Sequence, residues 1–84
     1  MSPNGGSNRV LNIKYIEFYP KNTVSVINSF GETVFRANNY DNVNVVWDGR
    51  NRNGRLVPDG VYYYIVEVEG VGVMASWVVV KIAN

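Results

Sequence analysis

The side chains of this sequence that could do chemistry gather in the stretch WDGRNRNGRLVPDG, which holds three arginines and two aspartates. Arg50, Arg52 and Arg55 are a candidate patch for an anion or a nucleic acid. Asp48 and Asp59 are a candidate pair of catalytic carboxylates. The aspartates flank the arginines and no aromatic side chains alternate with them, which argues against a nucleic-acid site. Both aspartates stand at turn positions that Asp favours for conformational reasons, so a structural role is preferred for each.

The composition argues against most enzyme chemistry. The chain has no histidine and no cysteine, so the usual nucleophile–base pairs and the commonest zinc ligands are missing. Calcium could be held by loop carbonyls together with Asp41, Asp48 or Asp59, but no dense acidic loop supports such a site. We therefore predict a protein that is not an enzyme and that has no cofactor and no metal ion.

Length and charge narrow the class further. The 84 residues fit one small domain with a thin core, and a net charge of +1 is too small to recruit nucleic acid or an anionic membrane. No apolar run approaches the roughly 18 residues of a membrane span, and the polar start MSPNGGSNRV is no signal peptide. We interpret residues 1–84 as a single domain excised from a larger secreted protein, with a short native open reading frame as the alternative.

The elements that must position these side chains have a period of two almost everywhere, and no stretch has a sustained helical period. Short strands separated by turn residues at intervals of about ten residues are typical of an all-β sandwich or barrel. We predict an Ig-like antiparallel β-sandwich of about six or seven strands. The strands expected from the pattern are 10–18, 23–30, 33–37, 43–47, 61–69 and 73–82.

Turn residues divide the charged stretch into three corners. Asp48 is expected to accept hydrogen bonds from the backbone that follows, with Gly49 at a positive φ. Asn53-Gly54 predicts a type I′ hairpin tip, and VPDG, with Pro58 and Gly60, predicts a type I turn.

Large aromatic residues stand on both sides of these corners. Trp47 is expected to pack under the turn, with Tyr62 and Tyr64 supplying further core area from the next strand. The opposite face of that strand and of the last strand carries a second apolar set, made of Tyr63, Ile65, Trp77 and Val79. This set is either a contact surface for a partner or a face covered by another part of the same sandwich.

Four segments in order resemble one bacterial family. WDGRNRNGRLVPDGVYYY resembles a pattern of several bacterial Ig-like domains, and SPNGGSN, IEFYPKNTVSVINSFGETVF and NNYDN narrow the resemblance. They are similar to the gliding motility-associated C-terminal domain, which is the type B sorting domain of type IX secretion cargo in Bacteroidetes. The residues that match the family pattern are Pro3, Asn4, Gly5, Asn8, Pro20, Asn28, Gly31, Trp47, Asp48, Gly49, Gly54, Pro58, Gly60, Tyr62 and Tyr64.

The sequence also departs from that pattern. The opening aspartates of the family fall on Gly6 and Arg9, and the arginine of its N-R-W-G step is Ser29. If the aspartates of the relatives bind an ion or cap a turn, that role is lost here.

The resemblance implies a secretion address without catalysis. Such domains stand at the C-terminus of large exported proteins, which cross the periplasm and pass through the type IX translocon to the cell surface or the medium. Their expected partners are the translocon and an associated outer-membrane protein. The alternative is a structural or adhesive Ig-like module of a surface protein, binding a glycan or a neighbouring protein, and a small hydrolase is disfavoured by the missing catalytic groups. We hypothesise that the final hairpin, 61–82, presents the recognised surface through Tyr63, Ile65 and Trp77.

Overall fold

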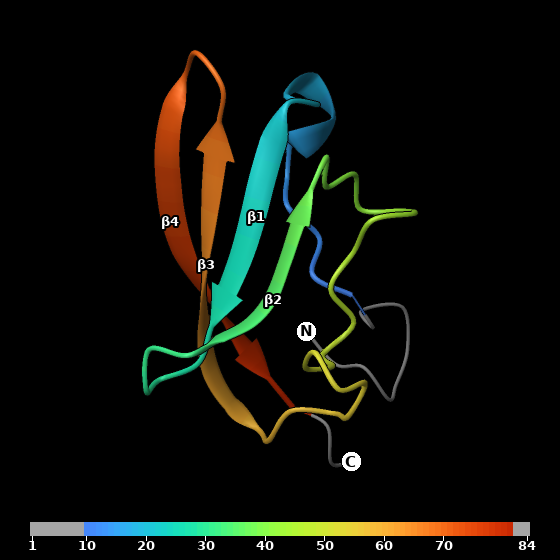
Figure 1. Ribbon diagram of the computed structural model, residues 1–84, viewed down its shortest axis with the longest axis vertical. Coiled ribbons are helices and arrows are strands. Elements are labelled where there is room, and N and C mark those ends of the chain that lie inside the picture. The colour runs from blue at the N-terminus through green and yellow to red at the C-terminus, as the bar shows by residue number, and fades with distance from the viewer. Residues whose placement is uncertain (1–9, 82–84) are drawn as a thin grey trace.

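A computed structural model describes residues 10–81 of the chain and contains one antiparallel sheet of four strands (Figure 1). The prediction of an all-β protein is confirmed. In chain order the elements are a short 3-10 helix, η1 (Ile16–Phe18), and strands β1 (Asn22–Ile27), β2 (Thr33–Asn38), β3 (Gly60–Val68) and β4 (Gly72–Val80). The strands lie side by side in the order β2-β1-β3-β4, so β2 and β4 are the two edges of the sheet.

Two hairpins build this sheet, and both stand within a few residues of the predicted strands. β3 and β4 pair without interruption from Gly60 opposite Val80 to Val68 opposite Gly72. β1 pairs with β2 on one side and with β3 on the other, and a bulge interrupts its pairing with β2. The alternation of apolar and polar residues is therefore sufficient to locate every strand of the observed sheet.

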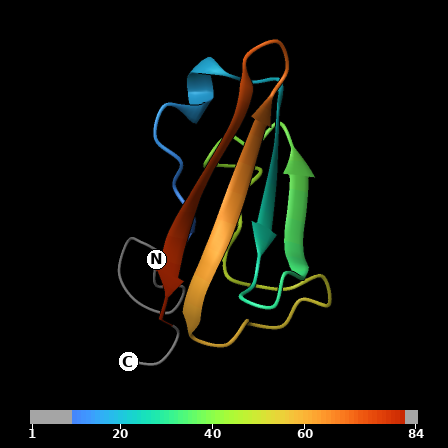
Figure 2. The ribbon, with the colours of Figure 1, turned by 90° about the vertical axis from the view of Figure 1, so that its left-hand side faces the viewer.

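Irregular segments stand where a second sheet was expected. Residues 10–21, including η1, and residues 39–59 cross one face of the sheet, which we call the inner face (Figure 1). Figure 2 looks onto the opposite, outer face, and no described segment crosses it. The described residues therefore form four strands and one sheet, and the sandwich of six or seven strands is not found among them.

The predicted strand 10–18 is wrong. A side-chain amide takes the place of a partner strand, because Asn42 accepts a hydrogen bond from the backbone N–H of Ile13 (2.8 Å) and donates one to its carbonyl (2.9 Å). Tyr15 then takes a left-handed φ of 69° and η1 follows. The alternation here reflects an extended segment with one apolar face, and β pairing is not needed to explain it.

The predicted strand 43–47 is also wrong, for a similar reason. The Asp41 carboxylate accepts hydrogen bonds from the N–H groups of Val43, Asn44 and Val45 at 2.8 to 2.9 Å. This Asx arrangement curls the backbone and uses the donors that a strand would offer to its neighbour.

The core lies between the sheet and the irregular segments. Val24, Val26 and Val66 from the inner face meet Trp47 and Tyr40 from the loops, all of them almost fully buried. The remaining buried apolar residues are Leu11, Ile13, Ile16, Val57, Tyr62 and Val80. No helix within residues 10–81 has the length and apolar character to cross a membrane.

Candidate functional site

Trp47 is the centre of the corner that the sequence singled out. Its indole N–H donates a 2.9 Å hydrogen bond to the carbonyl of Arg50, and its ring lies 5.6 Å from that of Tyr62. The Tyr62 hydroxyl donates to the carbonyl of Pro58 at 2.7 Å, and this bond ties the start of β3 to the preceding turn. Trp47 and Tyr62 thus lie in the core as predicted, and Tyr64 packs against it from a partly exposed position.

The loop beyond this tryptophan closes on itself. Gly49 takes a φ of 86° and its carbonyl accepts a hydrogen bond from the N–H of Val57. Gly60, at a φ of 153°, begins β3. These glycines occupy backbone conformations that residues with a Cβ rarely adopt, which is a structural reason for the WDG and PDG steps.

The type I′ turn predicted at Asn53-Gly54 is not the one observed. The N–H of Gly54 bonds to the carbonyl of Asn51, so Arg52 and Asn53 are the central residues, and neither has a positive φ. Gly54 follows at a φ of 81°, and this is the three-residue hairpin with glycine in the left-handed position. The Asn51 side chain stabilises it by accepting from the N–H groups of Asn53 and Arg55.

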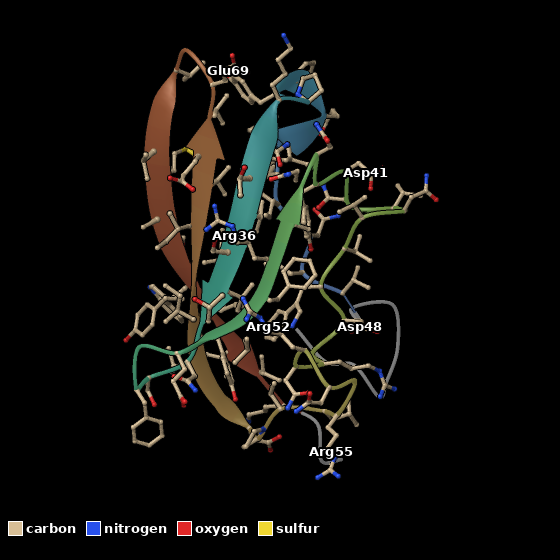
Figure 3. The ribbon with its side chains drawn as sticks, in the orientation of Figure 1. Arg36, Asp41, Asp48, Arg52, Arg55 and Glu69 are labelled. Atoms are coloured by element: carbon tan, nitrogen blue, oxygen red, sulfur yellow. The ribbon has the colours of Figure 1, made fainter. Side chains whose placement is uncertain are left out.

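The charged groups of this loop do not form the predicted kinds of site. Asp48 has no backbone hydrogen bond within the described residues, contrary to expectation, and its carboxylate instead lies 3.4 Å from Nε of Arg50. Arg50 also donates to the carbonyl of Gly54 at 3.0 Å. Arg52 and Arg55 leave the loop in different directions (Figure 3). The three arginines therefore do not converge on one ligand position.

Three further residues of the family pattern lie at turns next to the strands of the sheet. The side-chain oxygen of Asn28 accepts hydrogen bonds from the N–H groups of Phe30 and Glu32, each at 2.9 Å, and Gly31 stands between them at a φ of 84°. The carbonyl of Pro20 accepts a bond from the Asn39 side chain at 2.7 Å. The matching residues Pro3, Asn4, Gly5 and Asn8, and the departures at Gly6 and Arg9, lie outside the described residues.

Sequence reasoning missed Tyr40, which fastens the two irregular segments together. Its hydroxyl donates to the carbonyl of Leu11 (2.6 Å) and accepts from the N–H of Trp47 (2.9 Å). Burial raises the pKa of Tyr40 from 10.0 to about 12 because the phenolate would lose its hydration. Asn22 holds the backbone of Tyr40 through both its amide oxygen and its amide nitrogen. The step NNYDN was a signal for a turn, and it contained nothing that identified this tyrosine as buried.

The acidic side chains do not meet to bind a cation. Among residues 10–81, no group of three or more acidic side chains comes close enough to hold a metal ion. The Asp41 carboxylate accepts hydrogen bonds from backbone N–H groups of its own loop. These bonds, that from Val45 first and that from Val43 next, lower the pKa of the carboxyl. Its role in this structure is to shape the loop.

The outer face of the sheet brings the predicted contact residues together. Tyr63 of β3 stands directly opposite Trp77 of β4, Ile65 stands opposite Ala75, and Val61 opposite Val79. Trp77 is 62% exposed and Tyr63 47% exposed, so two large aromatic side chains at paired positions are open to solvent. We call Tyr63, Ile65, Trp77 and Val79 the outer strip. The outer strip is an apolar patch of the kind that marks interaction surfaces.

Comparison with known families decides what kind of domain this is. A model of the family described as CHU_C, type IX secretion signal domain, matches residues 1–80. The chain belongs to this family. No curated protein and no solved structure matches it significantly. The match of this type IX secretion signal domain spans the sheet, the tryptophan corner and the outer strip.

Membership gives the domain a role in sorting. A type IX secretion signal marks a larger cargo protein for export by that system, to the cell surface or the outside. Trp47, Gly49 and Gly60 of this corner serve the fold, Trp47 through its burial and the glycines through their positive φ. Tyr63 and Trp77 of the outer strip instead expose large aromatic side chains on the sheet face that the described segments do not cross.

Proposed function

We propose that this domain is a non-catalytic address at the C-terminus of a secreted cargo, carried from the periplasm through the type IX translocon. An associated outer-membrane protein is the proposed receptor. Membership in the secretion signal family supports the sorting role. The outer strip supports recognition as a folded domain, because a compact sheet can present an apolar surface that an unfolded tail cannot.

The observation that carries this proposal is the exposed pair of Tyr63 and Trp77. Large aromatic side chains are the commonest energetic centres of protein interfaces, and here two of them stand at directly paired positions on one face of the sheet. Ile65 and Val79 extend the pair along the two strands.

Export of a reporter tests the function. The domain is fused behind a signal peptide and a fluorescent protein, in a gliding bacterium whose type IX translocon is intact or disabled. We expect fluorescence at the surface or in the medium in the intact strain alone. Retention in the periplasm of both strains, even when the neighbouring outer-membrane protein is co-expressed, would favour the adhesive module.

Substitution of the outer strip tests the recognised surface. Trp77→Ser is expected to lower export by at least about tenfold, since interface aromatics often contribute that much to affinity. Val43→Ser is the control, because Val43 is a 74% exposed apolar residue of the segment 39–59, which crosses the inner face (Figure 1). Equal export of Trp77→Ser and wild type, with both folded by circular dichroism, would exclude the outer strip.

A further inference from the structure

The two edges of the sheet differ in how they are protected. β2 is six residues long, carries Arg36, and pairs with β1 through a bulge, and all three features discourage the addition of another strand. β4 is nine residues long, has no charged residue and no proline, and pairs with β3 without a bulge. A long, uncharged, regular edge is the kind that accepts a further strand.

The exposed backbone of β4 is the first observation. β4 lies at one edge of the sheet (Figure 2), and within the described residues its neighbour is β3. On an edge strand, alternate N–H and C=O groups point away from the sheet. We restrict the argument to its first two thirds, Gly72–Trp77. This segment is the edge segment.

A groove beneath the edge segment is the second observation. A cavity of about 490 Å³ lies on the inner side, between the β3–β4 hairpin and the region of η1. Met74 of β4 (60% exposed) and Phe18 of η1 (69% exposed) both line it. Apolar side chains make up most of the rest of its described lining, among them Ile13, Ile16, Val66 and Val71. Side chains of an added strand that point inward would enter this groove, since alternate residues of a strand share one face.

The third observation is the charge of the groove lining, which indicates what kind of segment would bind there. Among residues 10–81, Lys14 is the only charged residue of the groove lining, and its ammonium lies 5.4 Å from the ring centre of Tyr15. No described carboxylate lies within ion-pair distance of it. The groove thus offers an apolar floor and one cation, and its complement is an apolar segment with a carboxylate.

We propose that the edge segment accepts an extended segment of a partner protein by strand addition, with alternate apolar side chains in the groove and a carboxylate facing Lys14. This inference rests on the proposed sorting function, for which it names the chemistry of the receptor. The outer strip and the edge segment are continuous through Trp77, so one receptor can cover the sheet face and extend the sheet.

Other occupants complement the groove less well. A second copy of the chain would present its own β4, GVMASWVVV, which has no carboxylate for Lys14. The N-terminal stretch MSPNGGSNR has neither an acidic residue nor alternating apolar residues. A foreign strand of stated chemistry is therefore the occupant that the charges favour.

A synthetic peptide tests the proposal in solution. The probe is a short acetylated peptide in which valine alternates with threonine and one end carries glutamate. On binding we expect slower hydrogen exchange at alternate amides of Gly72–Trp77, by at least about tenfold at saturation, and a blue shift of Trp77 fluorescence. N-methylation of the peptide amides along one edge should abolish binding, and methylation along the other edge should not.

Two lysine variants separate the edge segment from general effects of charge. Met74→Lys replaces an apolar side chain of the groove by a charged one, which the inward valines of the peptide would have to desolvate, and it is expected to weaken peptide binding by at least about tenfold. Thr33→Lys adds the same charge to an exposed position of β2 and should leave binding unchanged. Equal binding by both methylated peptides, or by both lysine variants, would overturn the proposal. Protection of β4 that grows with protein concentration and needs no peptide would overturn it in favour of a second copy.

The export reporter distinguishes the failure of this inference from the failure of the proposed function. If wild type is exported and Met74→Lys is exported equally well while Trp77→Ser is not, the sorting function stands and strand addition is wrong. If wild type is not exported in any strain, the sorting function fails whatever the peptide does. Loss of export in Met74→Lys, with Thr33→Lys unaffected, supports both.

Discussion

The buried hydroxyl of Tyr40 makes two hydrogen bonds, to the carbonyl of Leu11 and from the N–H of Trp47, and so joins two segments that are far apart in sequence. Tyr40→Phe leaves the carbonyl of Leu11 and the N–H of Trp47 buried without a partner. We expect the free energy of unfolding in urea to fall by about 1–3 kcal/mol. Tyr63→Phe, which removes a hydroxyl from a half-exposed ring, should change it by less than about 0.5 kcal/mol. Equal effects would mean that the Tyr40 hydroxyl is not what joins the segments.

The same residue predicts a loss of stability at high pH. The pKa of Tyr40 is about 12 in the folded protein and 10.0 in its ordinary environment, so the unfolded chain loses this proton first. The contribution of protonated Tyr40 to the free energy of unfolding is complete below pH 10 and is lost as the pH rises from 10 towards 12. The free energy of unfolding should fall by roughly 1–2 kcal/mol more over this interval in wild type than in Tyr40→Phe. If the free energy of unfolding changed with pH in the same way in wild type and Tyr40→Phe, this prediction would be wrong.

At the scale of single elements, the β3–β4 hairpin depends on its turn. Gly70 takes a φ of 78° where the N–H of Val71 bonds to the carbonyl of Val68. A Cβ on Gly70 would meet no atom within 4 Å, so the cost of Gly70→Ala is conformational alone. We expect a loss of about 1–2 kcal/mol in the free energy of unfolding, with Val71→Ala in the same turn nearly neutral. No loss in Gly70→Ala would mean that this turn relaxes to another type.

The elements also show what the sequence could and could not predict. The strands β1 to β4 follow from alternation because each pairs with a neighbour through its backbone. The segments 10–18 and 43–47 alternate too, but the side chains of Asn42 and Asp41 take their hydrogen bonds. Whether a backbone group meets a strand or a side-chain amide is decided by tertiary contacts, which a period of two does not report.

The candidate site was predictable to a similar degree. The alternation in β3 and β4 placed Tyr63, Ile65, Trp77 and Val79 on one face, which the register bears out. Whether another layer covers that face could not be read from the pattern, since it depends on how the irregular segments cross the sheet. The groove beside Met74 was missed because its wall comes from a segment that was expected to be a strand.

At the scale of the whole molecule, an open apolar face is combined with a charge close to zero. The net charge is +1 and the isoelectric point is about 8.0, so little repulsion keeps copies apart near that pH. Trp77→Lys adds one charge and interrupts the outer strip, and it should raise the soluble concentration at pH 8.0 several-fold after ultracentrifugation. Val43→Lys adds the same charge at an exposed apolar residue of the segment 39–59, on the inner side, and should raise the soluble concentration little. An equal rise in both variants would assign the effect to net charge, and the outer strip would then not be the surface through which free domains associate.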